Sequence, residues 1–223
     1  MNLALFDLDH TLIPFDSGMA WTQYLVRRGV LPAQAEARYL EHCRLHVAGT
    51  LDIHAMHRAC VLPLAACPRS EVSAWLQDFG VEVAPRLPAA ARVLVDAHLR
   101  RGDLCAIVTA TTRFIAEPFA RLFNVVHLLA TEPATLGGRA DSAWTGDIQG
   151  EPCFRAHKLG HVSRWLEQMG QHLDGFESST FYSDSASDLP LLRAVTHAVA
   201  VRPDQRLRAV AESAGWRVIE DLA

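Results

Sequence analysis

Apolar and polar positions follow two different patterns in different parts of the chain. Leu3–Leu8 is a short apolar run that ends in acidic residues, and it predicts a buried parallel strand. From about Ser17 to Val83, apolar side chains instead recur at helical spacing, with almost no strand-like alternation. This stretch therefore predicts about four helices in succession.

Strands and helices alternate after Pro85 and Pro88. The pattern predicts helices over 89–101, 114–123, 155–169, 188–194 and 204–214, strands over 104–108, 125–130, 179–183, 198–201 and 216–219, and one arm of a hairpin over 144–148. Such alternation is typical of a parallel sheet with helices on both faces. We therefore predict an α/β fold with a doubly wound parallel sheet, formed by residues 1–14 and 85–223, and an inserted all-helical cap domain, formed by residues 15–84.

Composition narrows the class of protein. Half of the 223 residues are hydrophobic and 21% are charged, which excludes a disordered chain. Lys and Arg number 21 against 25 for Asp and Glu, so the net charge of −4 predicts no nucleic-acid or membrane partner. Five cysteines without a C-x-x-C pattern are typical of reduced thiols. We expect a cytoplasmic protein, either a monomer or a homodimer.

Polar side chains able to do chemistry stand directly after three of the predicted strands. They are Asp7, Asp9 and Thr11 after the first strand, Thr109 after the second, and Asp184 and Asp188 after a later one. Ligands of doubly wound sheets bind beyond the carboxyl ends of the strands, so we expect these groups to converge, together with Lys158. Clustered carboxylates repel one another unless a cation holds them, and all-oxygen ligation suits Mg²⁺, which in turn suits a phosphate substrate.

These segments resemble the four motifs of the haloacid dehalogenase superfamily. Phe6–Leu12 (FDLDHTL) resembles its D-x-D-x-T motif, and Ile107–Thr111 (IVTAT) resembles its second motif, a strand ending in Thr or Ser. Lys158 stands where the third motif places its lysine, and Tyr182–Leu192 (YSDSASDLPLL) resembles the G-D-x-x-x-D motif, with Ser183 in place of glycine. The helical insertion resembles the C1 cap of the phosphoserine-phosphatase-like branch, subfamily IB.

The resemblance implies a role for each catalytic residue. Asp7 would be the nucleophile that forms an aspartyl-phosphate, and Asp9 would be the general acid and base. Thr109 would donate a hydrogen bond to a phosphoryl oxygen, and Lys158 would neutralise the charge shared by the phosphate and Asp7.

The same resemblance implies the metal site. Asp7, the backbone carbonyl of Asp9 and Asp184 would hold Mg²⁺, and Asp188 would accept from a metal-bound water. Thr11 would brace the first loop and contact the substrate together with Ala110. Plain capping of a helix is an alternative for Thr11, and a capping role could coexist with the metal role for Asp188.

The cap is expected to select the substrate, because the motifs recognise only phosphate. Asp16 could meet an ammonium group, and Arg44 or Arg58 could meet a carboxylate, although a solvated surface charge is the alternative for each. Phosphoserine phosphatases carry Ser-Gly-Gly in the second motif and a Glu after the first, and this chain has neither. The segment Arg202–Arg208 is closer to the bacterial branch that includes histidinol-phosphatases.

We therefore expect a Mg²⁺-dependent phosphatase for a small phosphorylated metabolite, with L-histidinol phosphate as the first candidate substrate and phosphoserine as the second. A phosphotransferase or mutase that uses the same aspartyl-phosphate is an alternative. A receiver-type signalling module is a further alternative, but receivers are about half as long and lack a second carboxylate at the position of Asp9, because a switch must keep its phosphate.

Overall fold

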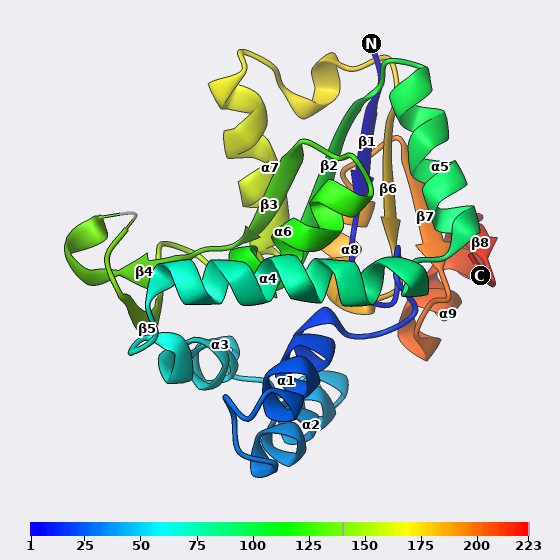
Figure 1. Ribbon diagram of the computed structural model, residues 1–223. Coiled ribbons are helices and arrows are strands. Elements are labelled where there is room, and N and C mark those ends of the chain that lie inside the picture. The colour runs from blue at the N-terminus through cyan, green and yellow to red at the C-terminus, as the bar shows by residue number, and fades with distance from the viewer. Residues whose placement is uncertain (140, 223) are drawn as a thin grey trace.

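The computed structural model describes residues 1–139 and 141–222. Ala140 and Ala223, which fall within the predicted core range 85–223, lie outside the described residues. A six-stranded sheet, parallel throughout, has the strand order β3-β2-β1-β6-β7-β8 (Figure 1). The strands are β1 (Leu3–Phe6), β2 (Leu104–Thr112), β3 (His127–Thr131), β6 (Ser179–Ser183), β7 (His197–Val201) and β8 (Arg217–Ile219). This order confirms the predicted doubly wound α/β fold.

Helices cover both faces of the sheet. The central strand, β1, is apolar throughout because its side chains are buried on both faces. Ala4 and Phe6 face the apolar cluster formed with α5 (Ala89–Arg100) and α6 (Arg113–Leu122). Leu3 and Leu5 face the cluster formed with helices on the opposite side, namely α7 (His157–Gln168), α8 (Leu189–Leu192) and α9 (Gln205–Ala214). Successive side chains of a strand point to opposite faces, so a strand buried on both faces has no polar position.

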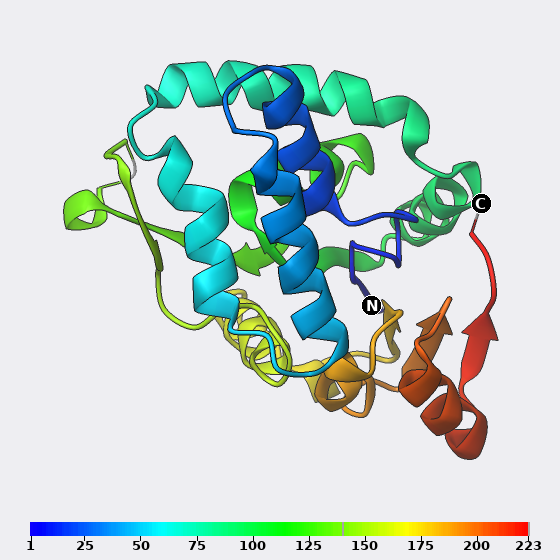
Figure 2. The same cartoon turned by 90° about the horizontal axis from the view of Figure 1, so that it is seen from below.

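The segment between β1 and α5 consists of helices. They are α1 (Ser17–Arg27), α2 (Gln34–Val47), α3 (Ile53–Val61) and α4 (Arg69–Val83), with 3₁₀ turns at Leu62–Leu64 and Ala84–Arg86. Figure 1 shows them beyond the carboxyl ends of the strands. Figure 2, seen from that side, shows α1, α2 and α3 in front, with α4 along the upper edge of the view. Residues 15–84 are all described and contain no strand.

The helical segment shares an apolar cluster with the sheet. Trp21 on α1 and Phe79 on α4 have ring centroids 5.2 Å apart, and Phe79 lies 5.8 Å from Phe119 on α6. A small antiparallel hairpin of β4 (Pro133–Thr135) and β5 (Trp144–Ile148) packs against α3. The hairpin confirms the predicted arm at 144–148, whereas the domain boundary at 15–84 stays a prediction.

Several strand ends differ from the sequence prediction, and two of them lie at the edge of the sheet where the predicted site residues stand. β1 ends at Phe6 because the chain turns after Leu8, whose carbonyl accepts from the N–H groups of Leu12 and Ile13. β2 continues past Val108 to Thr112 through a register shift against β3, so the second-motif threonines belong to the strand. The predicted helix at 188–194 is a 3₁₀ turn, Ala186–Asp188, followed by α8.

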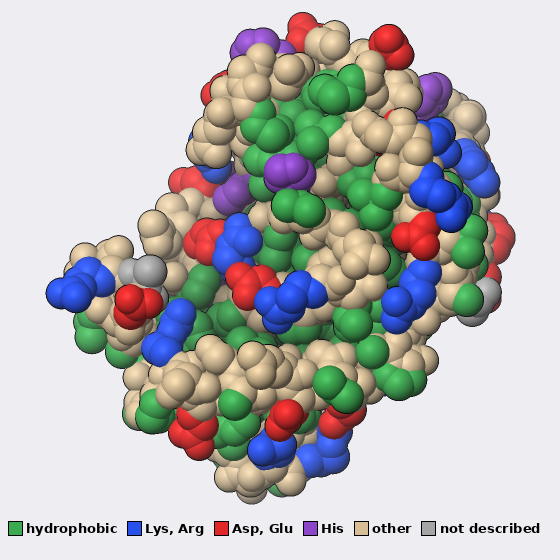
Figure 3. All heavy atoms as spheres, turned by 45° about the horizontal axis from the view of Figure 1, so that its top comes forward, with side chains coloured by type: hydrophobic (Ala, Val, Ile, Leu, Met, Phe, Trp, Pro, Cys, Tyr) green, Lys and Arg blue, Asp and Glu red, His purple; other side chains and the backbone are tan. Residues whose placement is uncertain are grey.

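Two properties concern the outside of the molecule. Among the described residues, no helix combines the length and the apolar character needed to cross a bilayer. On the face shown in Figure 3, acidic and basic side chains lie next to one another, so the charge there is mixed.

Candidate active site

The site forms where the strand order reverses. From β1 the chain builds the sheet outward through β2 and β3, and then returns to place β6 on the other side of β1. Asp7 and Asp184 directly follow these two neighbouring strands. The hydroxyl of Thr11 lies 3.3 Å from Asp7 Oδ2 and 3.2 Å from Asp184 Oδ1, so two carboxylates 177 positions apart in the chain share one donor. Thr11 therefore lies between the two carboxylates, and its bracing and substrate-binding roles stay predictions.

Lys158 completes the cluster from the first turn of α7. Its buried Nζ donates to Asp7 Oδ1 and to Asp188 Oδ2, both at 2.7 Å, and Ser183 also donates to Asp188 Oδ2. Burial by itself would lower the pKa of Lys158, but Asp188 and Asp7 raise it above the ordinary lysine value. Lys158 is therefore a permanent ammonium group beside the predicted nucleophile.

Lys158 is also the single lysine of the chain, because the other 20 of the 21 basic residues are arginines. A compact ammonium fits between two carboxylates in a small buried space better than a planar guanidinium does. This count is a sequence signal for Lys158 that is independent of the motif position.

The chemistry of the cluster fits a divalent cation. Burial, followed by Asp7 and Asp188, raises the pKa of Asp184 well above its ordinary value. Within the described part of the chain, Asp184 has no ion pair with a basic side chain, and Asp188 Oδ1 is buried without a hydrogen-bond partner. Three carboxylates against one ammonium leave negative charge that oxygen-binding cations such as Mg²⁺ neutralise.

The fit to Mg²⁺ also depends on how many side chains would bind the ion directly. No group of three or more His, Cys, Asp or Glu side chains in residues 1–139 and 141–222 is arranged as a metal site. Mg²⁺ usually keeps several waters and takes one or two carboxylates, so the predicted side-chain ligands, Asp7 and Asp184, would need no third carboxylate beside them. The predicted remainder of the set is the Asp9 carbonyl and an outer contact to Asp188.

Asp9 is held by donors from two different elements. Its Oδ1 accepts from the backbone N–H of Ser17, the first residue of α1, at 2.8 Å, and its Oδ2 accepts from the Thr111 hydroxyl at the end of β2, at 2.7 Å. Burial, followed by the charge of Asp16, raises the pKa of Asp9 to about 7, against the lowering effect of the two donors. A carboxyl with a pKa near neutrality can both give and take a proton.

The other second-motif residues lie beside this group. Thr109 is buried, and its hydroxyl oxygen accepts from the Thr111 N–H at 3.2 Å. The carbonyl of Ala110 accepts from the Thr131 hydroxyl at 2.8 Å. Both residues are therefore fixed by hydrogen bonds at the edge where Asp7 and Asp9 stand.

The three predicted cap residues differ in their surroundings. Asp16 is the N-cap of α1, and its Oδ1 accepts from Met19 N–H and from the Tyr39 hydroxyl. Arg44 is exposed and pairs with Glu41 on its own helix. Arg58 is exposed and pairs with Asp147 on β5 at 2.7 Å. Only Asp16 is thus placed next to the motif residues, and the substrate roles of all three stay predictions.

A second contact joins the helical segment to the rim of the site. The ring of His46, near the end of α2, lies 5.6 Å from the ring of Phe154, and Arg155 donates to the carbonyl of Gly49 at 2.9 Å. Burial, followed by the charge of Arg155, lowers the pKa of His46. The end of α2 therefore reaches the segment that precedes Lys158.

Sequence reasoning missed several supporting side chains. Ser17 and Thr111 hold Asp9, and Ser183 holds Asp188. Arg202, which follows β7, donates to the carbonyls of His10 and Thr11 at 2.9 and 2.8 Å and so braces the loop after β1. Each of these contacts joins residues that are far apart in the chain or that a turn brings together. A local sequence pattern therefore does not predict them.

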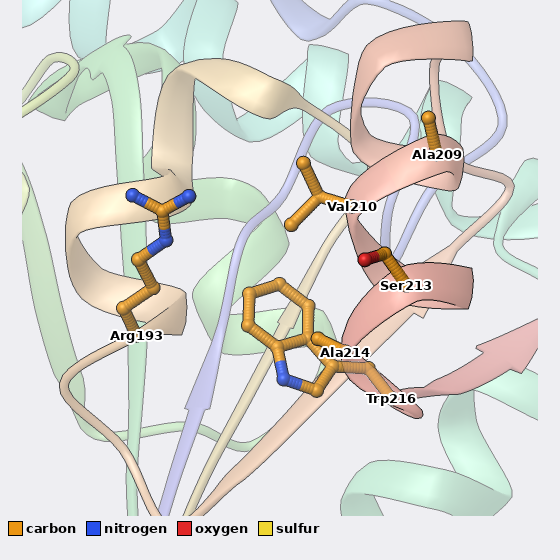
Figure 4. A pocket seen from close by; sticks show the side chains of 6 residues that line it. All are labelled: Arg193, Ala209, Val210, Ser213, Ala214 and Trp216. Carbon is orange, nitrogen blue, oxygen red and sulfur yellow. The ribbon is translucent and has the colours of Figure 1, made fainter.

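A hollow of about 430 Å³ lies elsewhere, between Arg193 and α9 (Figure 4). It is lined by Arg193, Ala209, Val210, Ser213, Ala214 and Trp216. None of the predicted site residues lines it, so this hollow is separate from the carboxylate cluster.

Comparison with known proteins agrees with the geometry. The family model for haloacid dehalogenase-like hydrolases matches residues 4–193. A histidinol-phosphatase of Neisseria meningitidis serogroup C (strain 8013) is 36% identical over 98% of both chains. A phosphoserine phosphatase of Mycobacterium tuberculosis (strain ATCC 25618 / H37Rv) is 29% identical, over 96% of this chain and 69% of its own length.

Solved structures show the same fold. A protein of unknown function from Bordetella pertussis Tohama I is 43% identical, with a TM-score of 0.90 over 100% of this chain and 99% of its own. A substrate-bound phosphoserine phosphatase complex has a TM-score of 0.69 at 17% identity, over 99% of this chain and 93% of its own. These findings confirm the resemblance drawn from the motifs: the chain is an enzyme of the haloacid dehalogenase-like hydrolase family.

Proposed function

We propose that this protein is a Mg²⁺-dependent phosphatase that hydrolyses a small phosphomonoester through an aspartyl-phosphate on Asp7. The observation that carries the proposal is the pair of 2.7 Å contacts from the single lysine, Lys158, to Asp7 and Asp188 beside Asp184. A buried carboxylate with a fixed ammonium on one oxygen is oriented for attack, and the same ammonium is placed to offset the charge of a transferring phosphoryl group.

The first step transfers the phosphoryl group to the enzyme. A carboxylate oxygen of Asp7 forms a bond to phosphorus while the bond from phosphorus to the ester oxygen breaks. Asp9, whose pKa is about 7, gives its proton to the departing oxygen, which leaves as an alcohol. Thr109 donates a hydrogen bond to a phosphoryl oxygen.

The second step regenerates the enzyme. Asp9, now ionised, takes a proton from a water molecule as the water oxygen attacks phosphorus. The bond between phosphorus and Asp7 breaks, inorganic phosphate leaves, and Asp9 is again protonated. Asp7 and Asp184, the Asp9 carbonyl and, through water, Asp188 would hold Mg²⁺, which when bound supplies positive charge against the phosphate oxygens.

The surroundings of the cap residues favour an amino-alcohol phosphate such as L-histidinol phosphate. Asp16 lies near Asp9, and among the described residues its Oδ2 has one weak contact, with the Cys43 thiol at 3.9 Å. Arg44 and Arg58, the predicted partners of a carboxylate, are exposed and engaged with Glu41 and Asp147. An acceptor for an ammonium group thus lies near the site, whereas the two arginines predicted to meet a carboxylate are paired with acidic side chains. This difference ranks phosphoserine, which carries a carboxylate, second, and the similarity to a histidinol-phosphatase supports the same order.

The test is a phosphate-release assay over small phosphomonoesters that include histidinol phosphate and phosphoserine. With Mg²⁺, Asp7→Asn should lower turnover at least about a thousandfold, because an amide is not a nucleophile here, and a chelator should stop the wild-type enzyme. Asp174→Asn, at an exposed carboxylate before β6, is the matched control and should keep full activity. Activity retained by Asp7→Asn would refute the proposed nucleophile.

The same assay separates hydrolysis from transfer. A phosphotransferase or mutase needs an acceptor alcohol, so phosphate release in its absence supports hydrolysis. A receiver-type switch would hold its phosphate, and Asp9 next to Asp7 argues against such a role.

A further inference from the structure

A hydroxyl chain joins the start of α1 to Asp9. The Thr111 hydroxyl lies 2.7 Å from Asp9 Oδ2, and the Ser17 hydroxyl lies 3.1 Å from the Thr111 hydroxyl. When Asp9 is ionised, Thr111 donates its single hydroxyl hydrogen to the carboxylate, so the hydrogen between the two hydroxyls comes from Ser17. The direction of the chain is therefore from Ser17 to Thr111 to Asp9.

Ser17 contacts Asp9 in two ways. Its backbone N–H donates to Oδ1 at 2.8 Å. Its hydroxyl is hydrogen-bonded to the Thr111 hydroxyl, which in turn contacts Oδ2. The Ser17 side chain is fully buried, and the start of α1 and the end of β2 are 94 residues apart in the chain. Both carboxyl oxygens of Asp9 are thus held where these two elements meet.

The two donors differ in freedom of movement. The Ser17 N–H belongs to the backbone of α1 and is fixed in direction, whereas the Thr111 hydroxyl can rotate about its C–O bond. The oxygen that Thr111 holds, Oδ2, is consequently the one that can be released toward a substrate without moving the backbone.

We propose that Thr111 is a positioning residue, which with Ser17 orients the Asp9 carboxyl so that Oδ2 is the oxygen that exchanges the proton with the leaving group and with water. This inference rests on the proposed function, since it assumes that Asp9 is the acid and base. In this proposal the hydrogen bond to the phosphoryl group is left to Thr109, as the family resemblance implies.

The test compares Thr111→Val, which keeps the shape and removes the hydroxyl, with Thr111→Ser, which restores it. Thr111→Val should lower kcat about tenfold and leave KM within about twofold, because misorientation of a catalytic group costs rate and not substrate binding. Thr111→Ser should recover most of kcat. A rise in KM with unchanged kcat would make Thr111 a substrate contact and overturn the proposal.

A double-mutant cycle tests the order of the chain. Ser17→Ala alone should lower kcat about threefold, and adding it to Thr111→Val should change kcat by less than about twofold, because the Ser17 hydroxyl acts only through Thr111. Additive losses would contradict the chain.

Thr112→Val is the matched control, since the Thr112 hydroxyl contacts His57 and not Asp9. It should lower stability and leave kcat within about twofold of the wild-type value. An equal loss of kcat in Thr112→Val would show a general disturbance of the strand end and overturn the proposal. A wild-type enzyme that releases no phosphate from any ester would instead refute the proposed function.

Discussion

At the scale of single residues, two donors in the site each contact two carboxylates. The Lys158 ammonium donates to both Asp7 and Asp188. The Thr11 hydroxyl lies within hydrogen-bond distance of both Asp7 and Asp184. Asp7, the proposed nucleophile, is therefore linked through these donors to Asp184 and Asp188, the two carboxylates that follow β6. This sharing makes Lys158 the most direct reporter of the state of the site.

Because the chain has one lysine, labelling with ¹⁵Nζ-lysine should give a single side-chain ammonium signal. The carboxylates raise the pKa of Lys158, so its signal should stay that of a protonated amine at an alkaline pH at which an exposed lysine has lost its proton. Inorganic phosphate added with Mg²⁺ should shift it, since the phosphate would lie next to Nζ. An Arg193→Lys variant adds the signal of an exposed lysine, whose chemical shift should not change when phosphate is added. If phosphate also leaves the chemical shift of Lys158 unchanged, the proposed phosphate site next to Lys158 is wrong.

Asp16 permits a second prediction at this scale. Asp16→Asn keeps a good N-cap for α1 but removes the charge, so the free energy of unfolding should change by less than about 0.5 kcal/mol. KM for an amino-alcohol phosphate should rise about tenfold, whereas KM for a phosphate ester without an amine should stay unchanged. Equal effects on both esters would remove Asp16 from ammonium recognition.

At the scale of elements, His57 on α3 links this helix to the end of β2 and to the hairpin of β4 and β5. His57 is 3% exposed, and its ring nitrogens bond with the Thr112 hydroxyl at 3.1 Å and with the Asp147 carbonyl at 3.2 Å. Burial lowers its pKa to about 4. His57 is therefore neutral in the folded protein and joins three elements that are distant in the chain.

The pH dependence of stability follows from this shift. Since the folded pKa lies below the unfolded value of about 6.5, the stabilisation is complete above that value and is lost as the pH falls toward 4. His57 should remove about 2 kcal/mol of unfolding free energy between pH 7 and pH 5. Urea unfolding should show a smaller loss for His57→Gln, and the exposed His54→Gln should keep the wild-type slope. Identical slopes for all three proteins would contradict a neutral, buried His57.

At the scale of the whole molecule, the helical segment and the sheet share one apolar cluster. Phe79 on α4 is fully buried and contacts Trp21, Tyr24 and Phe119 with ring centroids 5.2 to 5.8 Å apart. The segment therefore lacks a separate core of its own on this side. We expect the cap and the sheet to unfold in a single cooperative transition.

Phe79→Ala should lower the free energy of unfolding by about 3–5 kcal/mol, because it leaves a cavity between α1, α4 and α6. Val81→Ala, on the same helix but 77% exposed, should change it by less than about 0.5 kcal/mol. Tryptophan fluorescence and circular dichroism should report the same transition in each protein. Two separate transitions would mean that residues 15–84 fold as an independent domain.

The sequence alone was enough to predict the order of strands and helices, and it named the side chains that the structure brings together after β1 and β6. These features are encoded locally: periodicity within a few residues sets each element, and Asp7, Asp9, Asp184 and Asp188 stand in short motifs directly after strands. The errors were small and lay mainly at element ends, where turns and a register shift outweigh periodicity, and in the predicted helix at 188–194, which is a 3₁₀ turn followed by α8.

Only the tertiary structure decided which side chains meet. The Ser17 and Thr111 contacts to Asp9, the Arg202 contacts to the loop after β1 and the ion pair of Arg58 with Asp147 join residues that are distant or separated by a bend. Such contacts depend on strand order and on how the helices pack over it, and these are properties of the whole chain. Local patterns carry no information about them, because a hydroxyl or a guanidinium in a sequence does not specify its partner.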